Sequence, residues 1–228
     1  MSANDYRGEI VWIIGASSGI GAALARALAE RGAVLALSAR RGEALEAVLA
    51  PLGSQHKIFP LDVTEPATVL QTAQAIQADF GRIDRIIFLA AAYTPMKLDA
   101  LDHGITQTII AVNLTAAFSI VQAAMKVFAT QPTRGQLALC GSVAGYTGLP
   151  GGQPYSATKA AIVNLAESLY AEKQQDFDIK LISPGFVRTP LTARNNFAMP
   201  MIISPEAAAT AIADGLRQSR FEIHFPKR

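Results

Sequence analysis

The sequence of 228 residues predicts a doubly wound α/β fold, in which helices cover both faces of a parallel β-sheet. Short apolar runs alternate with longer segments of helical pattern along the chain, and no repeat or low-complexity tract interrupts them. Half of the residues are hydrophobic and 17% are charged, as in a well-buried protein. We therefore expect residues 1–228 to form a single domain.

Seven apolar runs predict the strands, and the segments between them predict the helices. The strands are expected at 9–14, 33–38, 56–61, 85–90, 135–140, 178–183 and 221–225. Helices are expected at 19–31, 42–52, 66–80, 105–130 and 154–172, with a last one starting at Ser204. Because ligands bind at the carboxyl ends of the strands in such sheets, we expect the loops after the strands to carry the chemistry.

Charge and composition argue against several classes of partner. The formal net charge is +2 and the basic residues are scattered, so a nucleic-acid partner is not indicated. Cys140 is the only cysteine, and the three histidines lie far apart, so neither a disulfide nor a metal site is expected. The N-terminal segment lacks the apolar core of a signal peptide, and no run approaches the roughly 20 apolar residues of a membrane span. We expect a cytoplasmic protein without a membrane partner.

The loop after the first strand reads GASSGIG and contains Gly15, Gly19 and Gly21. Missing side chains at this point permit a tight turn and a close approach of a ligand to the backbone. The helix N-terminus that follows can hold a pyrophosphate. Glycines also mark plain turns, but this position favours a dinucleotide site of the Rossmann type.

The loop after the second strand indicates which dinucleotide is preferred. An acidic residue here would bind the ribose 2′-hydroxyl of NAD, whereas an arginine accommodates the 2′-phosphate of NADP. Arg40 and Arg41 follow Ala39, and Ser38 is small enough to leave room for the phosphate. The alternative is that both arginines are solvated residues ahead of a helix. We expect NADP (NADPH) to be preferred, with NAD as the second choice and Arg40 as the better phosphate ligand.

Tyr155 and Lys159 stand four residues apart at the start of a predicted helix, so their side chains share one face. An ammonium near a phenol favours the phenolate. This pair by itself fits either a tuned proton donor or a helix edge that covers a core.

Four motifs occur in order along the chain: Gly15–Gly21, Ser142, Tyr155-Ser-Ala-Thr-Lys159, and Pro184-Gly-Phe-Val-Arg-Thr189. Together they make the sequence resemble the short-chain dehydrogenase/reductase (SDR) family over nearly its whole length. The resemblance implies an NADP-dependent oxidoreductase that transfers hydride between NADPH and a carbonyl compound or secondary alcohol. The competing interpretation is a non-catalytic dinucleotide-binding or redox-sensing protein with a degenerate site.

The resemblance also implies roles for particular residues. Tyr155 is the expected general acid and base, and Lys159 is expected to lower its pKa and bind the nicotinamide ribose. Ser142 is expected to bind the substrate oxygen together with Tyr155, and Asn113 to join a proton relay through water. Alternatives are a turn-capping role for Asp62 and a locally satisfied, buried Asn113. The implied cofactor contacts are Gly15, Ser17, Ser18, Gly19, Ile20, Gly21, Arg40, Arg41, Asp62, Val63, Ala90, Tyr155, Lys159, Pro184, Gly185, Val187 and Thr189.

One stretch departs from the family pattern. Phe88-Leu89-Ala90-Ala91 stands where the family has Asn-Asn-Ala-Gly. Phe88 and Leu89 cannot supply the asparagine hydrogen bonds, whereas the alanines remain small enough for a close backbone approach.

Position along the chain suggests further substrate contacts. Candidate pocket residues are Tyr93, Val143, Tyr146, Leu149 and Phe186. Five apolar residues of the tail either roof the substrate as a mobile lid or make core contacts: Phe197, Met199, Met201, Ile202 and Ile203.

The resemblance further implies a homo-oligomer formed through the helices around Asn113 and after Tyr155, with a dimer favoured over a tetramer. Four alanines are small enough for close packing there: Ala160, Ala161, Ala166 and Ala171. Alanines serve ordinary helix–sheet contacts equally well.

Overall fold

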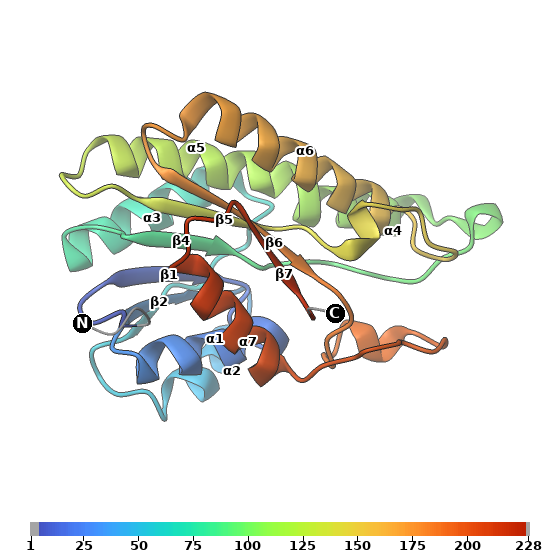
Figure 1. The fold of residues 1–228 in the computed structure, drawn as a ribbon, viewed down its shortest axis with the longest axis horizontal. Helices are drawn as coiled ribbons and strands as arrows, with labels where there is room; N and C mark the ends of the chain where they lie inside the picture. The colour runs from blue at the N-terminus through green and yellow to red at the C-terminus, as the bar shows by residue number, and fades with distance from the viewer. Residues whose placement is uncertain (1–4, 227–228) are drawn as a thin grey trace.

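The computed structural model describes residues 5–226, which form one α/β domain around a seven-stranded parallel sheet (Figure 1). The strand order is β3-β2-β1-β4-β5-β6-β7. The strands are β1 (Ile10–Ile14), β2 (Val34–Ser38), β3 (Lys57–Ile58), β4 (Arg85–Phe88), β5 (Gln136–Cys140), β6 (Asp178–Pro184) and β7 (Glu222–Phe225). The predicted fold class is confirmed.

Helices cover both faces of the sheet (Figure 1). They are α1 (Gly19–Glu30), α2 (Gly42–Leu49), α3 (Pro66–Phe80), α4 (His103–Ile110), α5 (Ala116–Ala129), α6 (Tyr155–Lys173) and α7 (Pro205–Leu216). Successive side chains of a strand point to opposite faces. Trp12 and Ile14 of β1 therefore pack in the core under α3, α5 and α6, whereas Val11 and Ile13 pack in the core under α1, α2 and α7. The apolar runs of the sequence are explained by this burial on both faces.

The helix expected at 105–130 begins two residues earlier and contains an irregular segment. Asp102 is its N-cap, and the carboxylate accepts a hydrogen bond from the amide of Ile105 (2.7 Å). The helix runs on to Ala129 through a π-helical segment, Ala111–Thr115. By length and composition it could cross a membrane, so the expectation that no segment reaches that length is wrong. Half of its most apolar window is buried inside the fold, as in the core helix of a globular protein.

Two strands are shorter than predicted. β3 is limited to Lys57–Ile58, although the amides of Phe59 and Leu61 still donate to the carbonyls of Leu37 (2.8 Å) and Ala39 (3.0 Å). β4 ends at Phe88, although the amide of Leu89 still donates to the carbonyl of Ile14 (2.8 Å).

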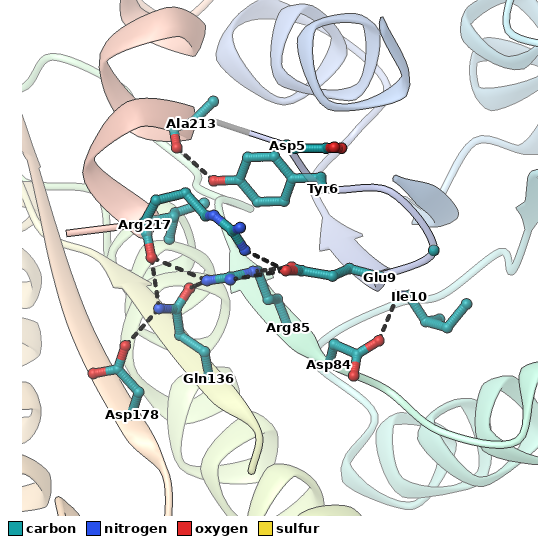
Figure 2. Close-up of polar contacts among 12 residues, drawn as sticks. Asp5, Tyr6, Glu9, Ile10, Asp84, Arg85, Gln136, Asp178, Ala213 and Arg217 are labelled. Atoms are coloured by element: carbon teal, nitrogen blue, oxygen red, sulfur yellow. Dashed lines mark hydrogen bonds and ion pairs between the residues drawn. The ribbon is translucent and has the colours of Figure 1, made fainter. Parts of the chain in front are cut away.

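A network of polar side chains joins the amino ends of the strands (Figure 2). Arg85, the first residue of β4, donates from Nε to Glu9 Oε2 (2.6 Å) and from Nη1 to the carbonyl of Leu216 (3.0 Å). Gln136, the first residue of β5, donates to the same carbonyl (2.9 Å) and to Asp178 Oδ2 (2.6 Å). We call Glu9, Arg85, Gln136 and Asp178 the amino-end network. It ties four strand starts to the last residue of α7.

Candidate active site

The three glycines after β1 are required by the shape of their turn. Gly15 has φ +97°, and a Cβ there would lie 2.6 Å from the amide nitrogen of Ala90. A Cβ at Gly21 would lie 2.2 Å from the carbonyl oxygen of Gly15. Ser18 is the N-cap of α1 but makes no side-chain hydrogen bond to it, so the first amides of this helix are not capped by that residue. Ser17 and Ile20 lie half-buried in the same turn. The turn therefore has the shape and the free helix N-terminus that a pyrophosphate requires.

The segment after β6 lies against this turn. Gly19 has φ +54°, and a Cβ there would lie 3.0 Å from Cγ2 of Thr189. The amide of Gly185 donates to the carbonyl of Phe225 (2.8 Å), and Val187 is buried in a bridge with Ile203. Pro184, the last residue of β6, is also buried. The first and last motifs of the sequence thus lie side by side in the fold.

The two arginines after β2 are exposed, and Arg41 is the N-cap of α2. Asp62 lies near Arg40, but its Oδ1 accepts hydrogen bonds from the amide (2.9 Å) and the hydroxyl (2.7 Å) of Thr64. These bonds hold the pKa of Asp62 below its usual value, and the charge of Arg40 acts in the same direction. Asp62 therefore caps the turn at Thr64, which was the alternative to a cofactor contact. Val63 is buried in the core.

Ser38 does not face this site. It is fully buried, accepts a hydrogen bond from Trp12 Nε1 (2.8 Å) and donates to the carbonyl of Phe59 (2.7 Å). The prediction that Ser38 leaves room beside a phosphate is therefore wrong, because its side chain turns inward to Trp12, which lies in the core under α3, α5 and α6.

The stretch that departs from the family pattern is accommodated by packing. Phe88 is buried in the core under α3, α5 and α6, and Leu89 packs on the core of the opposite face. Ala90 then presents its backbone to Gly15. Apolar contacts on both faces hold the chain here in place of side-chain amide bonds.

Asn113 holds the chain just beyond that stretch. Its Oδ1 accepts from the amide of Ala92 (2.7 Å), and its Nδ2 donates to the carbonyl of Ala92 (2.9 Å) and to Thr158 Oγ1 (3.2 Å). It is buried in the π-helical segment. The side chain is locally satisfied and connects the loop after β4 to α6; sequence reasoning missed both of these partners.

Ser142 and Tyr155 are brought together by a tight packing of two turns. Ser142 starts the short 3₁₀ turn η3 (Val143–Gly145), and its Oγ accepts from the amide of Ala144 (3.1 Å). A Cβ at Gly145 would lie 2.8 Å from the carbonyl carbon of Lys159, so η3 rests directly on α6. A hydroxyl that accepts one bond keeps its own proton to donate. The ring of Tyr93 lies edge-on to that of Tyr155, at 5.1 Å between centroids.

Lys159 is buried and lies beside the ring of Tyr155. Its Nζ is 5.6 Å from the ring centroid and donates to the carbonyl of Cys140 (2.7 Å). Burial lowers the pKa of Lys159. Burial also raises the pKa of Tyr155, and the hydrogen bond with Ser142 opposes that shift. The expected lowering of the Tyr155 pKa by Lys159 is therefore wrong for this structure, in which desolvation is the largest influence.

Ser142, Tyr155 and Tyr93 border a cleft at the carboxyl ends of β4, β5 and β6. Its lining consists of Tyr93, Ser142, Val143, Ala144, Leu149, Pro150, Gly152, Tyr155, Ser156, Gly185, Phe186, Leu191, Thr192, Asn195 and Phe197. Five of the proposed pocket and lid residues are thus in place. Tyr146 is not part of the lining, so its expected place in the pocket is wrong. The tail residues Met199, Met201, Ile202 and Ile203 do not line the cleft either, and Ile203 packs against the core under α1, α2 and α7, as in the alternative of core contacts.

Among the lining residues that were not proposed from the sequence, three stand together: Leu191, Thr192 and Asn195. They belong to the segment around the short 3₁₀ turn η4 (Thr192–Arg194), which follows the last motif and has no recognisable pattern of its own. Asn195 Oδ1 accepts a hydrogen bond from the hydroxyl of Tyr93 (2.8 Å). A larger groove between α7 and the edge strand β7 is lined by Ile203 and by none of the predicted catalytic or cofactor-binding residues.

Only some of the alanines proposed for an oligomer interface are at the surface. Ala160 and Ala171 are exposed and Ala161 is half-buried. Ala166 is fully buried in the core under α6, so its proposed interface role is wrong.

Comparison with known proteins supports one family throughout. A family profile for short chain dehydrogenases matches residues 9–199. An uncharacterized oxidoreductase of Myxococcus xanthus (strain DK1622) is 32% identical over 230 residues, covering 99% of this chain and 90% of that protein. The 3-oxoacyl-[acyl-carrier-protein] reductase FabG of Escherichia coli (strain K12) is 31% identical over 189 residues, covering 82% of this chain and 77% of that protein.

Two solved structures are similar to this chain over nearly its whole length. The crystal structure of gox2181 has a TM-score of 0.87 at 20% identity, covering 97% of this chain and 95% of that one, and shows the shared fold. A short-chain type dehydrogenase/reductase from Mycobacterium marinum has a TM-score of 0.85 at 26% identity with the same coverage of both chains. The chain therefore belongs to the short-chain dehydrogenase/reductase family and is an NAD(P)-dependent oxidoreductase.

Proposed function

We propose that this enzyme transfers hydride between NADPH and a carbonyl compound or the corresponding secondary alcohol. The observation that supports this most is the convergence of Ser142 and Tyr155 at one cleft, through the packing of η3 on α6, with Lys159 beside the ring of Tyr155. The bound nicotinamide would supply the hydride for reduction and accept it in oxidation. A non-catalytic sensor is not favoured, because relatives of this chain are named oxidoreductases and reductases.

The proposed cofactor site is the glycine turn with the segments packed around it. Gly15, Gly19 and Gly21 leave space that a Cβ would fill, next to the N-terminus of α1. In the proposal this turn binds the pyrophosphate, and Thr189 lies beside it. Arg40 binds the 2′-phosphate, since it is exposed at the end of β2 and no carboxylate follows that strand before α2.

In the proposed mechanism Ser142 and Tyr155 act on the same substrate oxygen. The hydroxyl of Ser142 accepts from the amide of Ala144 and keeps a proton, which in the proposal turns from the phenol of Tyr155 to that oxygen. Tyr155 donates a proton to the oxygen during reduction and accepts one during oxidation. A phenol with the ordinary pKa of about 10 is protonated at neutral pH, and burial, which raises the pKa of Tyr155, keeps it so before substrate and cofactor bind. Lys159 contributes positive charge beside the phenol and binds the ribose.

Replacement of Tyr155 tests the mechanism. Tyr155→Phe removes the proton donor and keeps the ring, so NADPH oxidation over a panel of ketones and aldehydes should fall by at least about 100-fold. The dissociation constant of NADPH should stay within about twofold, because the ring packing is unchanged. Tyr170→Phe, at an exposed position of the same helix, is the control. Turnover at the wild-type level in Tyr155→Phe would remove this residue from the mechanism.

Two dissociation constants test the cofactor preference. A guanidinium–phosphate contact contributes ~1.5–3 kcal/mol, so NADPH should bind about ten- to a hundredfold more tightly than NADH. Ala39→Asp with Arg40→Ala should reverse the order, since the carboxylate binds the ribose and repels the phosphate. Equal affinities in the wild type would mean that Arg40 and Arg41 are solvated residues only.

The proposal includes a cytoplasmic homodimer that buries the outer faces of α5 and α6. Phe118 of α5 is 49% exposed, and Met125 lies two turns further on at the same helix surface. Ala160 and Ala171 of α6 are exposed as well. Light scattering should give a dimer for the wild type and a monomer for Phe118→Glu; a wild-type monomer would contradict the assembly.

A further inference from the structure

Tyr146 was expected in the substrate cleft, but its side chain lies outside it and joins two other parts of the fold. The hydroxyl donates to Glu222 Oε1 (2.6 Å) on the edge strand β7. It also lies 3.1 Å from the hydroxyl of Ser183 near the end of β6. Tyr146 is 55% exposed. Its hydroxyl has two polar contacts, with side chains from two neighbouring strands.

The backbone of Tyr146 belongs to the turn that presents Ser142. Ser142 starts η3 and Tyr146 ends it: the amide of Gly145 donates to the carbonyl of Ser142 (2.9 Å), and that of Tyr146 to the carbonyl of Val143 (3.2 Å). The turn rests on α6 on one side, through Gly145. The hydroxyl of Tyr146 provides a second attachment, to β6 and β7.

The attachment on β6 is next to the opposite wall of the cleft. Ser183 is fully buried and directly precedes Pro184 and Gly185, and Gly185 lines the cleft. Glu222 is in register with Leu181 of β6, so the carboxylate comes from the strand that flanks this segment. One side chain therefore connects the turn that carries Ser142 to the strand that carries Gly185.

We propose that Tyr146 is a positioning residue, which holds the hydroxyl of Ser142 at a fixed distance from Gly185 on the opposite wall of the cleft. This inference rests on the proposed role of Ser142 as donor to the substrate oxygen. Hydrogen bonds to a carboxylate are among the strong ones, so the contact with Glu222 restrains the turn although it is partly exposed. A displacement of about 1 Å at a reacting group can cost about 100-fold in rate, so a smaller shift of Ser142 is sufficient to be measured.

Tyr146→Phe removes the two hydroxyl contacts and keeps the ring. We expect kcat for carbonyl reduction to fall about tenfold, because the donor is displaced in the transition state. The dissociation constant of NADPH should stay within about twofold, since no proposed cofactor ligand is touched. Tyr170→Phe is the matched control, a second exposed tyrosine whose ring packs on Phe221, and it should leave kcat unchanged.

Hydrogen exchange gives a second measurement that does not depend on turnover. The amides of Gly145 and Tyr146 should exchange about five- to tenfold faster in Tyr146→Phe and in Glu222→Ala, and at the wild-type rate in Tyr170→Phe. Glu222→Gln keeps an acceptor oxygen and should restore most of the protection and of kcat lost in Glu222→Ala. The double variant Tyr146→Phe/Glu222→Ala should be no slower than the worse single variant, because both remove the same contact.

The inference would be overturned if Tyr146→Phe had the kcat and the exchange rates of the wild type. It would also be overturned if the effects of Tyr146→Phe and Glu222→Ala on kcat multiplied in the double variant. A fall in melting temperature without faster exchange at η3 or a lower kcat would assign Tyr146 a role in stability alone and would also overturn it. A wild-type enzyme that reduces no carbonyl compound would refute the proposed function, whereas the exchange rates would still decide whether Tyr146 holds the turn.

Discussion

Lys159 and Lys180 are both almost fully buried, 2% and 1% exposed, yet they lie in contrasting surroundings. Lys180, in the amino half of β6, donates to the carbonyls of Gln218 and Arg220 (both 2.8 Å) and lies 3.3 Å from Asp178 Oδ2. Among residues 5–226, Lys159 has one hydrogen-bond acceptor, the carbonyl of Cys140. A buried ammonium has three donors to satisfy, so Lys180 is fully paired and Lys159 is not.

The same contrast separates the two ends of the sheet. At the amino ends, the side chains of the amino-end network satisfy one another and the carbonyl at the end of α7 (Figure 2). At the carboxyl ends, the hydroxyl of Ser156 is buried beside the cleft without a partner in the described part of the chain. Satisfied polar groups stabilise a fold, whereas under-satisfied ones cost stability and are kept where a ligand uses them. We infer that the amino ends serve stability and the carboxyl ends serve the reaction.

Breaking the amino-end network should have the largest effect on stability. Arg85→Met removes the bonds to Glu9, Gln136 and the carbonyl of Leu216, while Glu9 keeps its pair with Arg217, so the free energy of unfolding should fall by about 3–5 kcal/mol. Lys57→Met removes an exposed ion pair with Asp79 and should cost less than about 1 kcal/mol. Urea unfolding of the two variants measures the difference. Similar losses would mean that the network does not stabilise more than a surface pair.

Exchanging each buried lysine for methionine compares the two ends directly. Lys159→Met removes an under-satisfied charge, so stability should be unchanged or rise by about 1–2 kcal/mol, while turnover is lost. Lys180→Met leaves the carbonyls of Gln218 and Arg220 without this donor and removes the charge beside Asp178, which keeps its bond from Gln136, so stability should fall by about 2–4 kcal/mol. Thermal and urea unfolding give both values. A destabilised Lys159→Met would contradict the contrast.

Two buried serines provide a smaller test of the same idea. Ser156→Ala removes a hydroxyl that has no partner, so the free energy of unfolding should rise by about 1 kcal/mol. Ser38→Ala removes a hydroxyl with two partners and should lower it by about 1–3 kcal/mol. If both substitutions change stability in the same direction, hydrogen-bond satisfaction does not separate the two positions.

His56 should give the smallest effect, seen as a change of stability with pH. Its Nδ1 accepts from the amide of Leu35 (3.1 Å) near the start of β2, and Nε2 contacts the carbonyl of Leu52 (3.0 Å). Burial lowers its pKa, so the folded protein holds the ring neutral. This contribution is fully present above the unfolded pKa of about 6.5 and is lost as the pH falls through the folded pKa.

Urea midpoints between pH 7.5 and pH 5 should therefore fall more in the wild type than in His56→Gln. His103→Gln, at an exposed position, should behave like the wild type. An unchanged slope in His56→Gln would exclude His56 as the source.

The order of strands and helices and the sites of the motifs could be determined from the sequence because their signals are local. Apolar runs of five residues mark strands buried on both faces, and Gly15 and Gly21 stand where any side chain would collide with the backbone. Even the clustering of Ser142 with Tyr155 follows from the rule that loops at the carboxyl ends of parallel strands lie together.

Only the tertiary structure decided which way several side chains point and what surrounds them. Ser38 turns inward to Trp12, Tyr146 turns away from the cleft to Glu222, and Ala166 faces the core. Each outcome depends on a partner from a distant part of the sequence, which no local pattern specifies. The raised pKa of Tyr155 has the same origin: its neighbour Lys159 is visible in the sequence, whereas the burial that outweighs any local charge exists only after the chain has folded.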